Sequence, residues 1–150
     1  MNIPKEIIEK KCTDAKEELK KINIELVSTD IVRDDPEEKE SKRAVKKLLT
    51  ENFDFLIVCV AGWIPSYTVI SITSEFYYKP ILLWGLSGYY ENDRLITTGD
   101  QAGTSAIRKT MEDMDYNFKY VYNCPNLLPR IDKIKNFAKA VKAVSSLKHS

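Results

Sequence analysis

Two short stretches of this chain carry side chains that could hold a small, neutral ligand. The apolar run FLIVCV, residues 55–60, is followed at once by Ala61, Gly62 and Trp63. Gln101 and Thr104 belong to the stretch TTGDQAGTS, residues 97–105. Trp63 offers a flat apolar face, and Gln101 and Thr104 offer neutral amide and hydroxyl groups. This combination suits a polyol or a sugar better than a phosphate or a metal ion, so Trp63, Gln101 and Thr104 are the candidate substrate-binding residues.

The sequence signatures of several other sites are absent. No glycine-rich phosphate-binding loop and no G-x-S-x-G nucleophile motif occurs. The one histidine, His149, stands at the C-terminal end, and Cys12, Cys59 and Cys124 are too far apart for metal-ligand spacing. Most acidic residues have a lysine or arginine partner at helical spacing, as solvated helix faces do. We therefore expect no catalytic residue, no metal ligand and no cofactor in this chain itself.

Each candidate residue also has a purely structural interpretation. Trp63 suits a cap on the end of a sheet as well as it suits a ligand platform. Trp84 lies inside an apolar run, so we expect it in the core. Asp100 and Thr104 are residue types that suit the N-cap and first turn of a helix, and for the 97–105 stretch alone this capping interpretation is the stronger one.

The apolar pattern predicts helices alternating with strands. Apolar residues recur every three or four positions over residues 3–22, 37–51, 66–77, 101–114 and 130–147, which predicts helices. Short apolar runs rich in β-branched residues predict strands at 24–28, 55–60, 81–86 and 118–124. The stretch 87–100 is polar and turn-forming, and Asp35 is a candidate N-cap for the second helix.

This order of elements predicts an α/β fold. Helices alternating with strands imply a parallel sheet covered on both faces, and right-handed crossovers make a flavodoxin-like three-layer α/β/α sandwich with a mostly parallel sheet the expected topology. The run 55–60 is expected to be buried on both faces, with Cys59 as a small hydrophobe within it. The loops after the strands then meet at one edge of the sheet and bring Trp63 and Gln101 together.

Composition excludes several classes of partner. The chain has 150 residues, which fits a single domain, and 23 basic against 22 acidic residues give a net charge of +1. Such a balance predicts binding neither to nucleic acid nor to a membrane surface. Apolar runs are too short to span a bilayer, and three widely spaced cysteines do not make a disulfide framework. We expect a cytoplasmic protein.

The two ends of the chain favour a longer protein. A doubly wound domain usually opens with a strand, whereas this chain opens with a helix, and it stops in the basic helix end Lys148-His149-Ser150. We expect residues 1–150 to be a single α/β domain that forms the N-terminal part of a longer multidomain protein. The alternative is a self-contained domain with a helical start.

The succession of these motifs resembles a known family. The block FDFLIVCVAGWIPSYTVISITSEFYYKPILLWGL, then TTGDQAGTSAIRKTM, then FKYVYNCP, is similar to the N-terminal region of the L-fucose/L-arabinose isomerases. The similarity covers most of the chain from Glu25 onward and lies in the order of the motifs, since no single motif is specific. Members usually begin with a strand ahead of the first helix, which this sequence lacks.

The resemblance implies a function that this chain shares with other domains. The family interconverts aldoses and ketoses, an intramolecular oxidoreduction that uses a divalent metal, usually manganese, held by residues of later domains. By resemblance, Trp63 matches an aromatic that closes over the sugar and Gln101 an amide that contacts it. Thr104 stands where some relatives have a histidine. The implied partners are a sugar, the remaining domains of the same protein and further copies in a homo-oligomer.

The sequence thus predicts the substrate-recognition and oligomerisation domain of a sugar isomerase-like protein, inactive as an isolated chain. The alternative is a stand-alone flavodoxin-like module that binds a sugar or a partner without catalysis. A reading frame that continues past Ser150 into residues carrying spaced Glu, Asp and His would favour the first hypothesis. A stop codon there would favour the second.

Overall fold

The computed structural model describes residues 5–22, 24–33, 37–62, 64–86, 89–96, 100–123 and 131–149. Helices and strands alternate over most of this length, as the sequence predicts. In chain order they are α1 (Lys5–Lys20), α2 (Lys39–Leu49), β1 (Leu56–Val60), α3 (Ser66–Thr73), the 3-10 helix η1 (Ser74–Phe76), β2 (Ile81–Leu86), β3 (Tyr89–Glu91), β4 (Arg94–Ile96), α4 (Asp100–Asp113), β5 (Phe118–Asn123) and α5 (Ile131–His149). The predicted N-cap Asp35 lies outside the described residues.

Within the described residues, the main sheet has three parallel strands in the order β1-β2-β5. β2 is the central strand, and all six of its residues are buried. The run ILLWGL can take the central place because it carries no polar side chain, and a strand covered on both faces exposes neither row of side chains to water. Trp84, which lies opposite Cys59 and Val121 in the register, is 1% exposed. The expectation that Trp84 is a core residue is confirmed.

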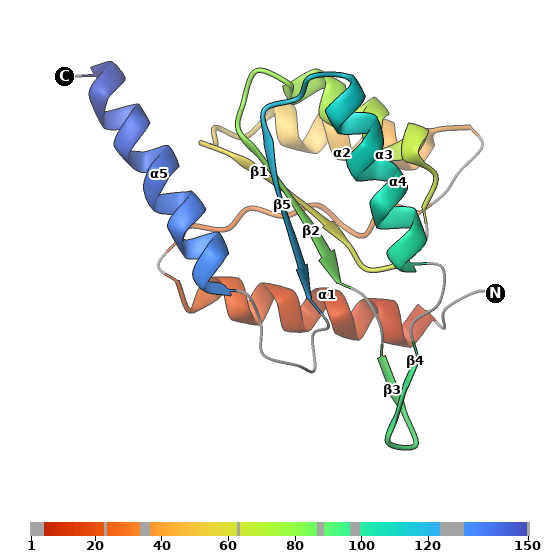
Figure 1. Cartoon of the computed structure of the whole chain (residues 1–150). Helices are drawn as coiled ribbons and strands as arrows, with labels where there is room; N and C mark the ends of the chain where they lie inside the picture. Colours follow the sequence, from red (N-terminus) through yellow and green to blue (C-terminus); the bar gives the residue numbers. More distant parts are fainter. Residues whose placement is uncertain are drawn as a thin grey trace.

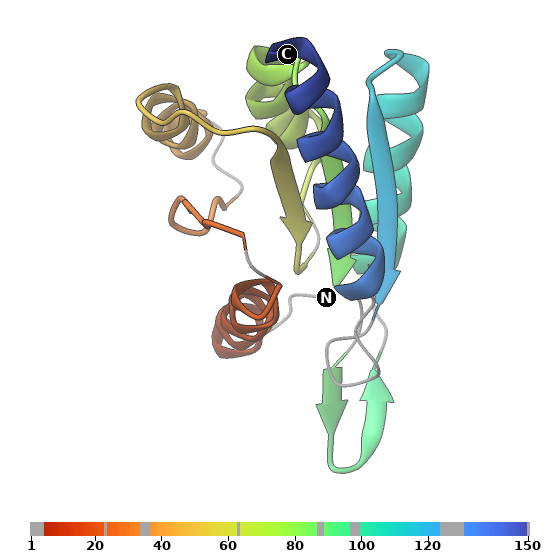
Figure 2. The same cartoon turned by 90° about the vertical axis from the view of Figure 1, so that its left-hand side faces the viewer.

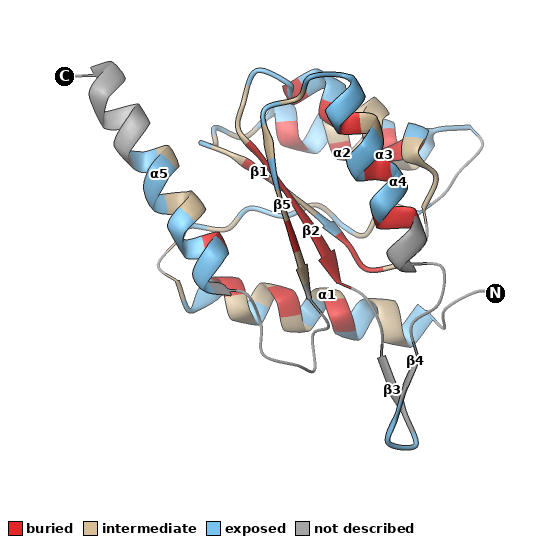
Figure 3. Ribbon diagram, in the orientation of Figure 1, coloured by how far each residue is buried: buried red, intermediate tan, exposed pale blue. Residues whose placement is uncertain are grey.

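Helices cover the two faces of the sheet (Figure 1). Alternate residues of β2 point to opposite faces, so Ile81 and Leu83 belong to one apolar cluster and Leu82 and Trp84 to the other. The first cluster includes side chains of α2, α3 and α4, and the second includes side chains of α1 and α5. Figure 3 shows the buried residues concentrated along β2 and on the sheet-facing sides of the helices. The described chain is therefore an α/β structure with helices on both sides of a parallel sheet.

β1 is an edge strand, which corrects one expectation from the sequence. Leu56 and Val60 are buried, whereas Ile57 and Val58 are partly exposed and Cys59 is exposed. The prediction that Cys59 is a buried small hydrophobe is wrong. A continuous apolar run does not distinguish an edge strand from a central one, because the helices that cover the faces leave the open side of the strand accessible.

The predicted strand at residues 24–28 does not form. Residues 24–33 contain neither helix nor strand and run from α1 to α2. The side chains still alternate as in a strand, with Ile24 and Leu26 partly buried and Glu25 and Val27 exposed. Local sequence supplies this alternation, but a strand also needs a hydrogen-bonding neighbour, and within the described chain β1 pairs only with β2.

A hairpin stands where the sequence predicts a polar, turn-forming connection. β3 and β4 pair antiparallel, with Glu91 opposite Arg94. Between them Asn92 and Asp93 have φ angles of 51° and 62°. Two consecutive residues with positive φ form the tight two-residue turn that matches the twist of a hairpin, and Asn and Asp tolerate that conformation. The Asn-Asp pair was the signal for this hairpin.

Candidate functional site

The carboxyl ends of the three parallel strands define the candidate site. β1 ends at Val60, β2 at Leu86 and β5 at Asn123, so these ends share one edge of the sheet. α3 begins at Ser66, six residues after the end of β1. Ligands of open parallel sheets bind at this edge, because the loops that leave the strands diverge there.

A buried lysine from α1 holds two of these strand ends. Lys11 is 4% exposed, and its Nζ donates hydrogen bonds to the carbonyl oxygens of Ala61 at 3.0 Å and Leu86 at 3.1 Å. α1 runs across the carboxyl end of the sheet in Figure 1. Lys11 therefore ties the residue that follows β1 to the last residue of β2, and it fixes where the two loops begin.

Sequence reasoning missed Lys11, although its position was a usable signal. The apolar stripe of the first helix contains Ile7, Ile8 and Ala15. Lys11 lies four residues after Ile7, three after Ile8 and four before Ala15, so it falls inside the stripe. Lysine is a residue type that usually lies on the solvated face of a helix. A lysine at an apolar position of a helix indicates a buried ammonium group, which requires hydrogen-bond acceptors.

α4 is packed closely against β2 at the same edge. A Cβ atom added at Gly85 would lie 2.8 Å from Cγ2 of Thr104 and 3.3 Å from Cδ2 of Tyr122. Thr104 itself is 1% exposed. The absence of a side chain at Gly85 thus lets the first turns of α4 approach the carboxyl end of β2, and α4 begins there at Asp100.

The three predicted ligand residues have different positions. Trp63 lies outside the described residues, between Gly62 after β1 and Ile64 before α3. The backbone of Gln101 is in the first turn of α4, next to the first helical residue Asp100. Thr104 is buried against Gly85, so its side chain takes part in helix–sheet packing. The structure brings the backbone of Gln101 to the carboxyl edge, and sugar contact by any of the three stays a prediction.

The cysteines of the described chain show no activation. Cys12 is partly buried and Cys59 exposed. Burial raises the pKa of the Cys12 thiol, with weaker opposing effects from Lys16 and Lys11. Burial by the surrounding protein atoms also raises the pKa of Cys59, whose accessible surface lines a cleft. Both groups are therefore thiols at neutral pH. Within the described part of the chain, no three His, Cys, Asp or Glu side chains come close enough to hold a metal ion.

Comparisons with known proteins identify no relative of this chain. No family model matches this chain, and no curated protein and no solved structure matches it either. In the described residues, no helix is both long and apolar enough to cross a membrane. The resemblance to the isomerases consequently stays a prediction.

Proposed function

We propose that this chain is the substrate-recognition and oligomerisation domain, N-terminal in position, of an aldose–ketose isomerase-like protein. One observation carries the proposal. The carboxyl ends of β1 and β2 and the start of α4 lie at one edge of the sheet, so the connection that contains Trp63 leaves from the edge at which α4, with Gln101 in its first turn, begins. Neutral hydrogen-bonding groups and an aromatic from these two connections suit a sugar.

The proposal includes the finer topology. The consecutive order β1-β2-β5 of parallel strands fits the last three strands of a flavodoxin-like sheet, whose order is 2-1-3-4-5. In this assignment β1, β2 and β5 take the last three places. The segment 24–28 corresponds to the outer strand of the other half, and the place between it and β1 belongs to one further strand.

The metal chemistry of such an isomerase is assigned to other domains. A divalent ion such as manganese, when bound, would polarise the carbonyl and hydroxyl oxygens of the sugar. The described residues supply no set of ligands for it. Our proposal therefore gives this chain binding and orientation of the sugar, in the cytoplasm and within a homo-oligomer, and leaves proton or hydride transfer to the remaining domains.

A titration followed by ¹⁵N NMR tests the proposal on this chain. L-fucose and L-arabinose are added to labelled protein, with glycerol as a control for non-specific effects. We expect the amide signals of Gly62, Ser66 and Gln101 to shift with saturation, because these groups surround the carboxyl edge. Met114, beyond the other end of α4, serves as the internal control and should not move. Absence of saturable shifts, or shifts centred on residues 24–31, would contradict the proposal.

A further inference from the structure

Two cysteines from distant parts of the sequence lie on the same face of the sheet. Cys59 pairs with Trp84 in the register of β1 and β2, and residues paired in this way point to the same face. Trp84 belongs to the apolar cluster that includes side chains of α1 and α5, and Cys12 of α1 packs against this cluster. The side chain of Cys59 therefore points to the face on which Cys12 lies.

A hydrogen bond next to Cys12 brings the two cysteines near one another. Lys11, the residue before Cys12, donates from Nζ to the carbonyl oxygen of Ala61 at 3.0 Å, and Ala61 stands two residues after Cys59. Figure 2 shows α1 beside the carboxyl end of β1. Both cysteines line the same cleft, which has a volume of about 770 Å³. The two side chains thus lie at one place between α1 and β1.

The electrostatic effects on the two thiols agree with this proximity. Burial is the largest cause of the raised pKa of Cys59, and the charge of Cys12 is the second. An effect of one ionised group on the pKa of another needs the two groups to lie close together. Lys11 and Lys16 act on both thiols in the direction opposite to burial, because a positive charge favours the thiolate. The two thiols and the two lysines therefore form one cluster.

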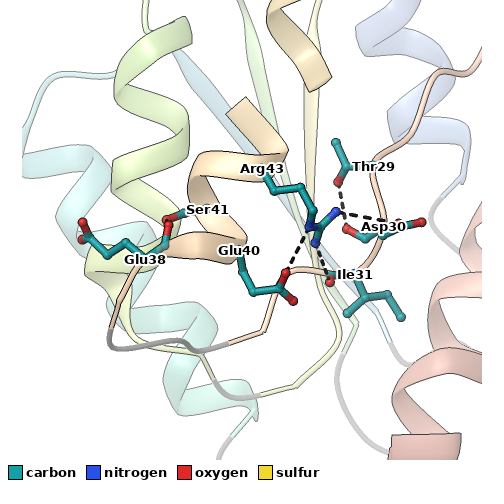
Figure 4. Close-up of polar contacts among 7 residues, drawn as sticks. All are labelled: Thr29, Asp30, Ile31, Glu38, Glu40, Ser41 and Arg43. Atoms are coloured by element: carbon teal, nitrogen blue, oxygen red, sulfur yellow. Dashed lines mark hydrogen bonds and ion pairs between the residues drawn. The ribbon is translucent and has the colours of Figure 1, made fainter. Parts of the chain in front are cut away.

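Contacts of the segment that follows α1 hold this helix in place. Arg33 lies 3.6 Å from the carboxylate of Glu9, which belongs to α1. Arg43 of α2 donates from Nη2 to the carbonyl oxygen of Ile31 at 3.2 Å and lies 3.8 Å from the carboxylate of Asp30. Figure 4 shows these contacts of Arg43. The segment between α1 and α2 is thus tied to both helices, so the place of α1 beside β1 is a property of the fold.

We propose that Cys12 and Cys59 are a redox-modification site, at which a low-molecular-weight disulfide such as oxidised glutathione converts the two thiols into one disulfide bond between α1 and β1. The bond adds a covalent link next to the hydrogen bond from Lys11 to Ala61, which already joins α1 to the end of β1. A reducing thiol reverses the reaction. This site does not depend on the proposed sugar site.

The reaction consists of two thiol–disulfide exchanges. One cysteine, as its thiolate, attacks a sulfur of oxidised glutathione, the S–S bond of glutathione breaks, and one glutathione leaves. The thiolate of the other cysteine then attacks the modified cysteine sulfur and displaces the second glutathione. The two thiols lose two protons and two electrons, and oxidised glutathione takes up both to become two reduced molecules. Burial raises the pKa of both cysteines, so we expect this exchange to be slower than that of an exposed thiol.

Oxidation of the full chain, followed by mass-spectrometric mapping of the non-reduced peptides, tests the pair. The chain is incubated with oxidised glutathione at about pH 8.5, near the ordinary pKa of a thiol. We expect the bond between Cys12 and Cys59 to be at least tenfold more abundant than either bond to Cys124, the third cysteine of the chain. In urea that unfolds the chain, this preference should fall below about fivefold, because only loop length then distinguishes the pairs.

Two variants separate a bond between the cysteines from modification of each cysteine alone. In Cys12→Ser and in Cys59→Ser, the cysteine that remains of the pair should carry one glutathione after oxidation. Oxidation of the unmodified chain should raise the urea midpoint of unfolding, because the cross-link restricts the unfolded chain. Dithiothreitol should reverse this rise, and neither variant should show it.

The proposal is overturned by any of three results. One is a separate glutathione on each of Cys12 and Cys59 in the folded chain with no bond between them, since the two sulfurs are then out of reach of each other. Another is a folded chain in which both thiols stay reduced while the same thiols react in urea. The third is oxidation that yields bonds to Cys124, or bonds between two copies of the chain, in amounts equal to the bond between Cys12 and Cys59.

Discussion

At the scale of single residues, Lys11 has the largest structural role that sequence reasoning did not assign. Taking an ammonium group out of water is costly, and the cost is offset only when acceptors surround it. The carbonyl oxygens of Ala61 and Leu86 provide two, at 3.0 and 3.1 Å. These oxygens belong to the ends of two strands, so the same contacts set the starting points of the loops at the candidate site.

Replacing Lys11 by methionine should lower the free energy of unfolding by about 1–3 kcal/mol, because two buried carbonyl oxygens lose their donor. The matched control is Lys10→Met. Lys10 is an exposed neighbour that bonds to Asp14 at 3.0 Å, and its loss should cost no more than about 0.5 kcal/mol. Urea unfolding followed by circular dichroism measures both. Equal losses for the two variants would show that the Lys11 contacts do not stabilise the fold.

The raised pKa values of the two described thiols predict how the stability of the fold changes at alkaline pH. Burial raises the pKa of Cys12 and Cys59 in the folded state. The unfolded chain therefore releases these protons first, so the contribution is fully present below the ordinary thiol pKa of about 8.5 and is lost as pH rises above it. Cys12→Ala should make the fall in urea midpoint between about pH 8 and pH 10 shallower than in the unmodified chain, because Cys12 is the partly buried thiol of the two. An unchanged slope would contradict this assignment.

At the scale of elements, the contact between α4 and β2 depends on Gly85. The position has no room for a methyl group, because Thr104 and Tyr122 are already in contact range. Tight packing of this kind transmits a small change in one element to its neighbour. The start of α4, with the backbone of Gln101, is held at the carboxyl edge by this contact.

Gly85→Ala should cost about 1–3 kcal/mol of stability, since the new Cβ would lie 2.8 Å from Cγ2 of Thr104. Thr104→Ser removes that methyl group. In the double variant, the loss should be smaller than the sum of the two single losses, because the clash is relieved. A double-mutant cycle from urea unfolding measures the coupling. Strictly additive losses would place the strain elsewhere.

Sequence patterns predicted the elements better than their partners. The predicted strands 81–86 and 118–124 contain β2 and β5 (Phe118–Asn123), because their composition is sufficient once helices cover both faces. The segment 24–28 has the alternating burial of a strand and yet forms no strand, since pairing depends on which segment lies beside it. Likewise, nothing local distinguishes β1 as an edge strand, and the burial of Lys11 follows from carbonyl groups located 50 and 75 residues away.

At the scale of the whole molecule, two apolar clusters lie on opposite faces of one central strand. β2 contributes to both, and helices from distant parts of the sequence complete each cluster. This arrangement leaves two kinds of surface. The carboxyl edge carries the proposed sugar site, and the open side of β1 is the place that the proposed topology gives to one further strand.

The most direct test of the account is a sugar titration that isolates Trp63. The chain has two tryptophans, and Trp84 is buried in the core, so Trp84→Phe leaves Trp63 as the sole reporter. We predict a saturable change in its fluorescence with L-fucose or L-arabinose, at a Kd in the millimolar range, about −4 kcal/mol. Trp63→Ala in the unmodified chain should abolish the sugar-dependent NMR shift of Gln101 while leaving the urea midpoint unchanged. No saturable change would contradict a sugar site at this edge. A loss of several kcal/mol of stability in Trp63→Ala would show that Trp63 is a core residue instead.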